Sequence, residues 1–500
     1  MGLARLASRG HAGMQTYPVT VEVHVAGGLP SFTVVGLPAT VVRESRERVR
    51  AALTNLNFTF PVGRIVAHLG PADRPKTGGC FDLPMALGVL LASGQLQANT
   101  EQVEFLGELA LNGELRPVPG ILPAVAAARE ANHELIVPAA NADEVGLVEA
   151  AKVRCAEHLG QVVEFLRGEG TLPNARTVIP LPHTNPATDM TDVLGQNQAK
   201  RALTVAAAGG HHLLMVGPPG SGKSMLAERL PGLLPAMDYQ DALDAAAVRS
   251  VAGLPIDIDR FYVRPFRRPH HGASPAALTG GGSRPRPGEI SLAHHGILFL
   301  DELPEFPRHT LEALREPIET GQISIARAAG HATFPARFQL IAAMNPCPCG
   351  YLGDRQQECV CTPQQVQSYR QRISGPLLDR FDIQIEVPRL AADVLAAGSM
   401  DGPDSETLRG KVSAARRRQL GRQSVANVEL TRTALNDVVD IDDPSRQLLT
   451  KAIEGYRLSA RGYVRILRVA RTIADLSGEA AVSQAAIAEA IALRCTTSRS

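Results

Sequence analysis

The sequence predicts an α/β protein in which a phosphate-binding domain with a parallel sheet is preceded by an α+β domain and followed by a helical one. Three features indicate this order. A glycine-rich segment beginning at Gly217 lies between an apolar run and a helical stretch, further short apolar runs follow it, and residues 389–500 are rich in alanine and leucine at helical spacing. Because 500 residues are too many for one hydrophobic core, we expect two or three domains.

Composition narrows the class of protein. The apolar fraction of 44% is typical of a globular protein, and no apolar run is long enough to span a bilayer. The first residues, MGLARLASRGHAG, lack the apolar segment of a secretory signal, so we expect a cytoplasmic protein that binds no membrane. In such a reducing compartment, the seven cysteines are more often ligands than disulfides. A net charge of +1 predicts no partner for the chain as a whole.

The first domain is predicted over residues 1–170, followed by a linker over residues 171–190. Alternating apolar residues at 17–38 predict strands, and residues 39–56 and 81–94 have helical patterns. The linker is rich in proline, threonine and asparagine and has little periodicity, so it predicts no regular element.

The second domain is predicted over residues 191–388. Its apolar runs HLLMVG, GILFLDE and FQLIAAMN are short, as in parallel strands that are buried on both faces. Residues 389–500 form the third, helical part, which contains the basic stretch VRILRVARTIADLSG.

The glycine-rich segment fits the phosphate-binding pattern G-x-x-x-x-G-K-[ST], with a strand before it and a helix after it. Its residues are Gly217, Pro218, Pro219, Gly220, Ser221, Gly222, Lys223 and Ser224. Glycines let backbone N–H groups surround phosphate oxygens, so the predicted cofactor is ATP with Mg²⁺. We expect Lys223 to reach the β- and γ-phosphates and Ser224 to hold the Mg²⁺ ion. The alternative is a chance glycine-rich turn.

Polar residues at two later strand ends extend this nucleotide site. Asp301 ends the run GILFLDE and fits a carboxylate associated with Mg²⁺, and Glu302 fits a base that orients the attacking water. Two ordinary acids at a helix start are the alternative. Asn345 follows the run FQLIAAM, where its amide could position water and the γ-phosphate, although a strand-end asparagine is also a common turn residue.

Two arginines are candidates for stabilising the charge that develops on the transferred phosphoryl group. Arg380 lies in GPLLDRFD among turn and acidic residues, and Arg461 begins a basic helix in LSARGYVRILRVAR. An arginine in this role contributes about 10³–10⁵-fold in rate. A solvated surface charge is the alternative for either one.

Four cysteines form two C-x-C pairs with nine residues between them: Cys347, Cys349, Cys359 and Cys361. Four thiolates can hold a structural zinc ion in a tetrahedral site, although C-x₂-C is the commoner spacing. Reduced thiols and disulfides are the alternatives. Two histidine pairs, His270–His271 and His294–His295, lack acids or cysteines at ligand spacing, so we expect loop or packing roles for them.

A local basic segment is the candidate nucleic-acid contact. Residues 260–290 contain six arginines and one acid, Glu289, beside the loop TGGGS. The arginines are Arg260, Arg264, Arg267, Arg268, Arg284 and Arg286. Such a patch would bind phosphates without regard to sequence and in a salt-dependent manner. A solvated face, paired with acids of a neighbouring subunit, is the alternative.

These motifs in this order resemble an AAA+ ATPase. The stretch RPFRRPHHGASPAALTGGGSRPRPGEISLAHHGILFLDELPEF resembles the magnesium-chelatase-like group, and NPCPCGY with VTVEVHVAGGLPSFTVVGLP resembles the bacterial ComM (YifB) family. The resemblance covers nearly the whole chain. It implies a Walker A motif at 217–224, a Walker B motif at Asp301 and Glu302, sensor 1 at Asn345, an arginine finger at Arg380 and sensor 2 at Arg461, with Arg465 second in line.

The family resemblance also implies an assembly and a process. A finger that acts on a neighbour's ATP implies a ring, most simply a homo-hexamer, and the insertion at about 260–290 would project into its pore. Family members are implicated in natural transformation as helicases that drive branch migration, so single-stranded or branched DNA and recombination proteins are the implied partners.

Residues 1–170 resemble the proteolytic domain of Lon, which uses a Ser–Lys dyad. Aligning the glycines places Cys80 near the nucleophile and Leu122 near the lysine. Leucine cannot act as the base that a nucleophile needs, and Lys76 is remote. We therefore expect a Lon-like scaffold without peptidase activity.

Three functions follow from these expectations. The first is a DNA motor, the second is a magnesium-chelatase-type ATPase that inserts a metal, and the third is a Lon-like protein unfoldase or protease. The missing lysine argues against the third. Nothing in the sequence indicates the tetrapyrrole site that the second would need.

Overall fold

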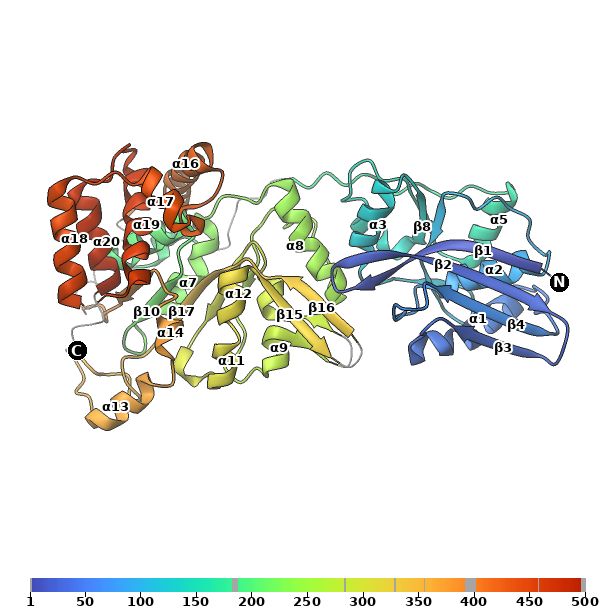
Figure 1. Cartoon of the computed structure of the whole chain (residues 1–500), viewed down its shortest axis with the longest axis horizontal. Helices are drawn as coiled ribbons and strands as arrows, with labels where there is room; N and C mark the ends of the chain where they lie inside the picture. The colour runs from blue at the N-terminus through green and yellow to red at the C-terminus, as the bar shows by residue number, and fades with distance from the viewer. Residues whose placement is uncertain are drawn as a thin grey trace.

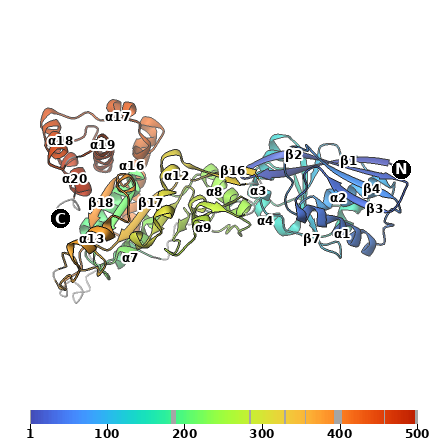
Figure 2. The ribbon, with the colours of Figure 1, turned by 60° about the horizontal axis from the view of Figure 1, so that its bottom comes forward.

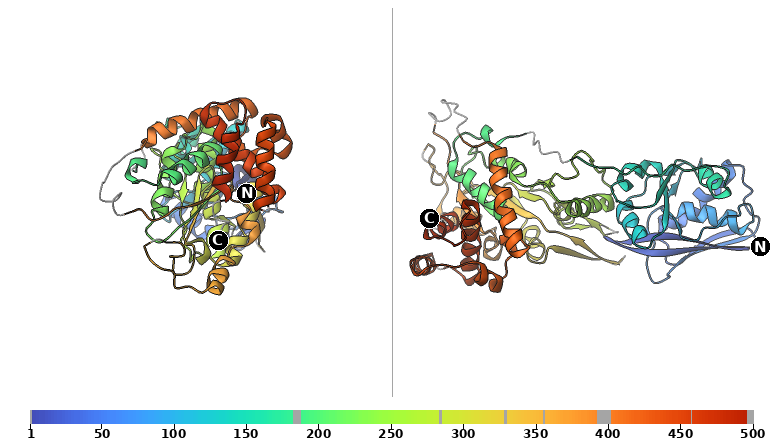
Figure 3. Two further views of the ribbon diagram at one scale, coloured as in Figure 1. Left: turned by 90° about the vertical axis from the view of Figure 1, so that its left-hand side faces the viewer. Right: turned by 90° about the horizontal axis from the view of Figure 1, so that it is seen from above.

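The computed structural model describes residues 2–181, 188–282, 285–327, 330–354, 356–391, 402–456 and 458–495. Figure 1 and the right panel of Figure 3 show an elongated molecule with three parts in a row. An α/β part lies at one end, a second sheet with its helices lies in the middle, and a group of helices lies at the other end. Within the described residues, no helix is long and apolar enough to cross a membrane.

The N-terminal part is built on a mixed seven-stranded sheet. Its strands are β1 (Gly2–Ala12), β2 (Gln15–Ala26), β3 (Ser31–Val35), β4 (Arg64–Gly70), β5 (Val103–Phe105), β8 (Glu134–Pro138) and β9 (Val153–Ala156), in the order β3-β4-β2-β1-β5-β8-β9. The smaller strands β6 (Glu108–Leu109) and β7 (Leu115–Arg116) pair with each other. Its helices are α1 (Thr40–Asn55), α2 (Asp82–Ala92), α3 (Ile121–Glu130), α4 (Ala142–Val145) and α5 (Leu159–Arg167).

The predicted alternation and helices of this part are confirmed, but one long strand was missed. Alternate residues of β2 from Tyr17 to Val25 face the core, as period-two patterning requires. Helix α2 is buried on nearly every side, which explains its unbroken apolar sequence. Strand β1 was not predicted, because GLARLASRGHA has few strong β-formers; it is held by antiparallel pairing with β2 along its whole length.

The central part contains a five-stranded parallel sheet in the order β11-β14-β17-β10-β18. Its strands are β10 (Leu213–Val216), β11 (Phe266–Arg267), β14 (Ile297–Leu300), β17 (Gln339–Met344) and β18 (Ile383–Glu386), with β12 (Gly280–Gly281), β13 (Arg286–Pro287), β15 (Gln322–Arg327) and β16 (Gly330–Pro335) in separate hairpins. Its helices are α6 (Asn197–Gly209), α7 (Lys223–Arg229), α8 (Tyr239–Ala252), α9 (Pro275–Thr279), α10 (Glu289–Leu292), α11 (Arg308–Glu312), α12 (Arg315–Thr320), α13 (Pro363–Arg370) and α14 (Gly375–Leu378). The three predicted apolar runs are thus confirmed as parallel strands β10, β14 and β17.

The C-terminal part is helical, as predicted. It contains α16 (Ser405–Gln423), α17 (Arg432–Val438), α18 (Asp443–Tyr456), α19 (Ala460–Ser477) and α20 (Gln484–Cys495). Figure 2 shows these helices gathered at the end of the molecule opposite the N-terminal sheet. They share one hydrophobic cluster with the central sheet, in which Ile466 of α19 and Ile487 of α20 join Leu213 of β10.

Helix α8 joins the central part to the N-terminal part. Leu243 and Ala246 of α8 belong to the hydrophobic core of the N-terminal part. Ser250 of α8 accepts the backbone N–H of Leu122 on its hydroxyl at 3.3 Å and that of Gly120 on its carbonyl at 2.8 Å. The interface therefore combines apolar packing with satisfied backbone groups at the start of α3.

Candidate active site

The glycine-rich segment forms the loop between β10 and α7, at the carboxyl edge of the central sheet. Gly222 has a φ of 90°, a left-handed conformation that favours glycine. A Cβ on Gly217 would lie 2.1 Å from the carbonyl oxygen of Val387, so no side chain fits at this position. Both glycines of the sequence pattern are therefore required by the backbone path itself.

Lys223 lies inside this loop rather than at the surface. Its Nζ donates to the carbonyl oxygens of Gly217 at 2.7 Å and Pro218 at 2.9 Å, and to Oδ1 of Asn345 at 3.3 Å. Burial lowers the pKa of Lys223 to about 8, and the carboxylates of Asp301 and Glu302 oppose that shift. The ammonium group is thus held at the centre of the loop, where a phosphate chain would replace its carbonyl partners.

The two predicted magnesium ligands lie side by side. Ser224 Oγ donates to Asp301 Oδ2 at 2.7 Å, which joins the start of α7 to the end of β14. Hydroxyl and carboxylate oxygens are the ligands Mg²⁺ prefers, so Ser224 and Asp301 would hold the ion when ATP·Mg²⁺ binds. The donor set therefore fits the predicted metal.

Arg268, which the sequence predicts as a DNA contact, lies at this site in the structure. Its guanidinium donates to Asp301 Oδ2 at 2.6 Å and to Glu228 Oε1 at 2.8 Å. It also lies over the ring of Phe299, 5.4 Å from the centroid. The signal that sequence reasoning missed is that Arg268 directly follows β11, which lies beside β14 in the parallel sheet, so both strands end at the same edge.

Glu302 has an unusual backbone conformation and an unexpected partner. Its φ of 53° is rare for a residue with a side chain, and such strain is concentrated at functional sites. Its carboxylate Oε2 lies 3.0 Å from Nδ1 of His271, which in turn packs edge-on against Phe306. His271 was expected to have only a loop or packing role, so this contact corrects that prediction. The structure places Glu302, Asp301 and Asn345 around Lys223, as the predicted nucleotide site requires.

Arg380 lies at the other edge of the sheet. It precedes β18, whose first residue, Ile383, is in register with Leu213, the first residue of β10. The loop that holds Lys223 follows the last residue of β10, so a four-residue strand, about 13 Å long, separates the two edges. Arg380 donates to Glu319 Oε1 at 2.5 Å, and its side chain is only 4% exposed.

The C-terminal arginines lie beside Arg380. Burial lowers the pKa of Arg380, and the positive charges of Arg461 and Arg465 contribute to the lowering. Arg465 donates to the carbonyl oxygen of Arg380 at 2.9 Å and to Asp382 Oδ1 at 2.6 Å. Arg461 is exposed. The structure thus groups Arg380, Arg461 and Arg465 together, away from the phosphate-binding loop of the same chain.

The predicted basic segment does not form one exposed patch, which corrects that expectation. Arg264 donates to the carbonyl oxygens of Pro235 at 2.9 Å and His295 at 2.7 Å, and burial lowers its pKa. Arg267 forms a bidentate pair with Glu289 at 2.6 and 2.7 Å. These two guanidinium groups hold the fold together and are not free to bind phosphate.

The remaining arginines of that segment have different positions. Arg286 lies on β13 and is exposed, and Arg260 is also exposed. Arg284 lies outside the described residues. The exposed arginines among the described residues of this segment are therefore Arg260, Arg268 and Arg286, and of these Arg268 is paired with Glu228 and Asp301.

The second histidine pair has acidic neighbours that were not foreseen. His295 Nδ1 lies 3.4 Å from Asp241 Oδ1, and its Nε2 lies 4.0 Å from Asp244 Oδ2. His294 accepts the backbone N–H of Arg337 at 3.1 Å. The expectation that these histidines lack partner acids is wrong, because α8 brings both aspartates across from another part of the sequence.

The N-terminal part offers no activated nucleophile at Cys80. This thiol is buried, burial raises its pKa, and its weak sulfur contact is to the carbonyl oxygen of Thr77. Lys76 is also buried, and its ammonium donates to the carbonyl oxygen of Pro71. Leu122 is packed at the start of α3, where its N–H meets Ser250 of α8. A thiolate nucleophile needs a nearby base or cation, and none of these contacts supplies one.

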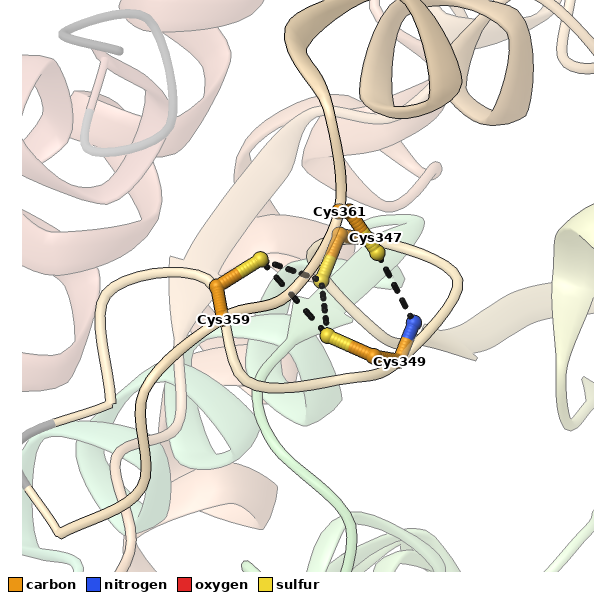
Figure 4. A group of neighbouring side chains, drawn as sticks. All are labelled: Cys347, Cys349, Cys359 and Cys361. Carbon is orange, nitrogen blue, oxygen red and sulfur yellow. Dashed lines mark hydrogen bonds between the residues drawn. The ribbon is translucent and has the colours of Figure 1, made fainter.

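The four cysteines of the C-x-C pairs come together directly after Asn345. Figure 4 shows their side chains coming together from two segments of one loop. Their four sulfur atoms all lie within 4.8 Å of one another.

Three known family models together match most of the chain. Residues 21–141 match "Subunit ChlI of Mg-chelatase", residues 189–395 match "Magnesium chelatase, subunit ChlI", and residues 402–494 match "Magnesium chelatase, subunit ChlI C-terminal".

Three relatives illustrate the range of similarity. Competence protein ComM of Haemophilus influenzae is 48% identical over 500 residues, 99% of this chain and 98% of that protein. The uncharacterized protein YifB of Escherichia coli is 45% identical over 500 residues, 99% of this chain and 97% of that protein. The DNA replication licensing factor Mcm6 of Anopheles gambiae is 33% identical over 96 residues, 19% of this chain and 11% of that protein.

Proposed function

This chain belongs to the ComM/YifB family of magnesium-chelatase-like AAA+ ATPases, and from that premise we propose that it is an ATP-driven motor that moves DNA as a ring of identical subunits. The observation that carries the proposal is the separation of Arg380 from the phosphate-binding loop of its own chain. The proposed process is helicase or branch-migration activity in DNA recombination during natural transformation, and the naming of the Haemophilus relative as a competence protein supports the link to transformation.

Hydrolysis would use the residues at the carboxyl edge of the sheet. Lys223 binds the β- and γ-phosphates, and Ser224 and Asp301 hold Mg²⁺, which neutralises developing charge on the phosphate oxygens. Glu302 orients the attacking water, and its contact with His271 at 3.0 Å fixes the carboxylate before the reaction. Asn345 positions the γ-phosphate, and Arg268 holds Asp301 in the orientation that the ion requires.

A complete site would need a second subunit. No step of hydrolysis in one chain can use Arg380 while about 13 Å of strand separates it from the phosphates. A neighbouring copy docked with its amino-edge arginines against the phosphates would supply Arg380, which would exchange its partner Glu319 for the phosphate, with Arg461 or Arg465 beside it. Repetition of such a head-to-tail contact closes into a ring, for which six subunits is the number we propose.

DNA binding would fall to the loops that project from the sheet. Among the described residues, Arg286 on the β12–β13 hairpin is the arginine closest in sequence to the glycines of TGGGS, and it is exposed. The hairpin β15–β16 lies in the same central part. Cations presented by several subunits around a pore would follow a phosphate backbone without reading bases. The partial similarity to Mcm6, a protein named for DNA replication, supports this direction.

The second candidate is an ATPase that inserts magnesium, which the family descriptions favour. The two candidates differ in what stimulates hydrolysis, so the test is the ATPase rate with and without single-stranded DNA. We expect stimulation that falls as salt rises. Unchanged hydrolysis together with no salt-sensitive DNA binding would defeat the motor proposal.

A charge reversal sharpens that test. Arg286→Glu should weaken DNA binding and stimulation while leaving the basal rate intact, because Arg286 lies on a hairpin outside the nucleotide site. The matched control is Arg446→Glu, which reverses an exposed charge on α18. Equal loss of DNA affinity in both variants would show that the effect is one of net charge and would remove Arg286 from the proposed contact.

A further inference from the structure

The loop after Asn345, residues 346–362, brings four cysteine sulfurs into one compact group, and we name this segment the cysteine loop; its residue 355 lies outside the described part. Three of the sulfurs lie close together: Cys347 to Cys349 is 3.4 Å, Cys347 to Cys359 is 3.6 Å, and Cys349 to Cys359 is 3.6 Å. The fourth sulfur, on Cys361, accepts the backbone N–H of Cys349 at 3.4 Å. Figure 4 shows the four side chains pointing toward a common centre.

These separations fit one tetrahedral metal ion. Zinc–thiolate bonds of about 2.3 Å place neighbouring sulfurs about 3.8 Å apart, close to the separations observed here. A disulfide would need two sulfurs at about 2 Å, and all four cysteines are free thiols. The described residues of the cysteine loop form no strand or helix, and an ion bound by four thiolates would contribute directly to the stability of such a loop.

The backbone around the sulfurs is arranged as in a structural metal site. Leu352 donates its N–H to Cys347 Sγ at 3.3 Å, as Cys349 does to Cys361 Sγ. N–H donors to sulfur stabilise thiolates and orient them toward an ion. A Cys₄ set leaves no coordination position open, so the ion would be structural rather than catalytic.

We propose that Cys347, Cys349, Cys359 and Cys361 bind one zinc ion, and that this ion clamps the cysteine loop against the phosphate-binding loop. The loop contacts that site directly. A Cβ on Gly350 would come within 2.6 Å of Cδ of Pro219, so the two loops touch with no space between them. On the other side, Arg389 lies 3.7 Å from Asp354 of the cysteine loop and donates to the carbonyl oxygen of Pro219 at 3.4 Å.

The clamp also reaches Asn345, which is separated from Cys347 only by Pro346. Arg370 of α13 donates to the carbonyl oxygen of Pro346 at 3.4 Å, so the chain on both sides of the zinc site is tied to the nucleotide site. Zinc loss would therefore release Asn345 and the contact of Gly350 with Pro219 together. A displacement of about 1 Å at a catalytic group can cost about 10²-fold in rate, and zinc-free protein is expected to lose activity on that order.

The first test measures the metal content of the full-length chain, purified without a metal-binding tag. Elemental analysis should find about one zinc per chain. Cys359→Ser should lose it, whereas Cys155→Ser, which changes a buried thiol of the N-terminal part, should retain it. Zinc far below one per chain, iron in its place, or full zinc in Cys359→Ser would overturn the proposed site.

The second test uses the unmodified chain, so it does not depend on a variant that folds. Titration with an organomercurial should release zinc in step with modification of four thiols, and basal ATP hydrolysis should fall with the zinc. Release of zinc with an unchanged hydrolysis rate would overturn the clamp. Because the readout is hydrolysis without DNA, a failure of the DNA-motor proposal would not be mistaken for a failure of this one.

Discussion

The replacement Arg380→Ala tests whether nucleotide sites are shared between subunits. Arg380 is separated from the phosphate-binding loop of its own chain by a four-residue strand, about 13 Å long. Nucleotide affinity should therefore stay within about threefold of the parent value, whereas kcat should fall by about 10³–10⁵-fold, the contribution of a supplied arginine. At 1.36 kcal/mol for each tenfold change, this loss is about 4–7 kcal/mol of transition-state stabilisation.

Mixing two inactive variants gives the decisive form of this assay. Lys223→Ala lacks a working phosphate-binding loop but still carries Arg380, and Arg380→Ala has the reverse defect. In an equal random mixture about a quarter of the contacts join an intact loop to an intact arginine, so about a quarter of the parent steady-state ATPase rate should return. Arg446→Ala serves as the control for the loss of an exposed arginine. If every mixture is as inactive as its components, or if Arg380→Ala alone retains kcat within tenfold, the reasoning from sheet geometry is refuted.

Three further changes have defined outcomes. Burial lowers the pKa of Lys223 to about 8, so the nucleotide-free protein loses this proton as pH rises. ATP affinity, measured by fluorescent-nucleotide titration, should therefore be about tenfold weaker at pH 9 than at pH 7. Lys223→Arg should abolish that pH dependence, and an affinity of the parent protein that does not change with pH would contradict the prediction. Arg268→Ala removes the partner that orients Asp301 and should lower kcat by about 10–100-fold with DNA affinity unchanged; loss of DNA affinity alone would restore its prediction as a DNA contact. Asp382→Ala removes the buried carboxylate that accepts from the guanidinium of Arg465. It should lower the free energy of unfolding of the central part, measured in urea, by about 3–5 kcal/mol. A loss below about 1 kcal/mol would contradict the role of this ion pair in stabilising the fold.

Local motifs could be predicted because they need few distant contacts. The path of the phosphate-binding loop follows from its glycines, and the positions of Asp301 and Asn345 follow from the ends of two buried strands. The same reason explains why the sequence predicted the strands β10, β14 and β17 and the C-terminal helices. Their apolar runs and helical spacing indicate which residues are buried in the hydrophobic core.

Features that depend on tertiary pairing were missed. Strand β1 has weak strand propensity and is fixed by β2, and the partners of Arg264 and Arg267 could not be inferred from a count of charges. Arg268 was assigned to DNA because its neighbours in sequence are basic, whereas its neighbours in space are Glu228 and Asp301. A run of charged residues shows only the local composition of the sequence. The order of strands in the sheet is needed to see which arginines lie at the nucleotide site.

The domain boundaries and the Lon-like character of residues 1–170 stay predictions. The described structure does show that the start of α3, where Leu122 lies, packs against α8 of the central part. Helix α8 therefore joins the central part to the N-terminal part.

The measurement that tests the shared-site account most directly is the particle mass of Glu302→Gln, which should bind ATP without hydrolysing it, in the presence of ATP, Mg²⁺ and single-stranded DNA. The account predicts a population at about six times the 53.2 kDa of one chain, and its disappearance when Arg286→Glu removes the DNA contact or Lys223→Ala removes the nucleotide. A particle that stays at the mass of a single chain under all of these conditions would contradict it.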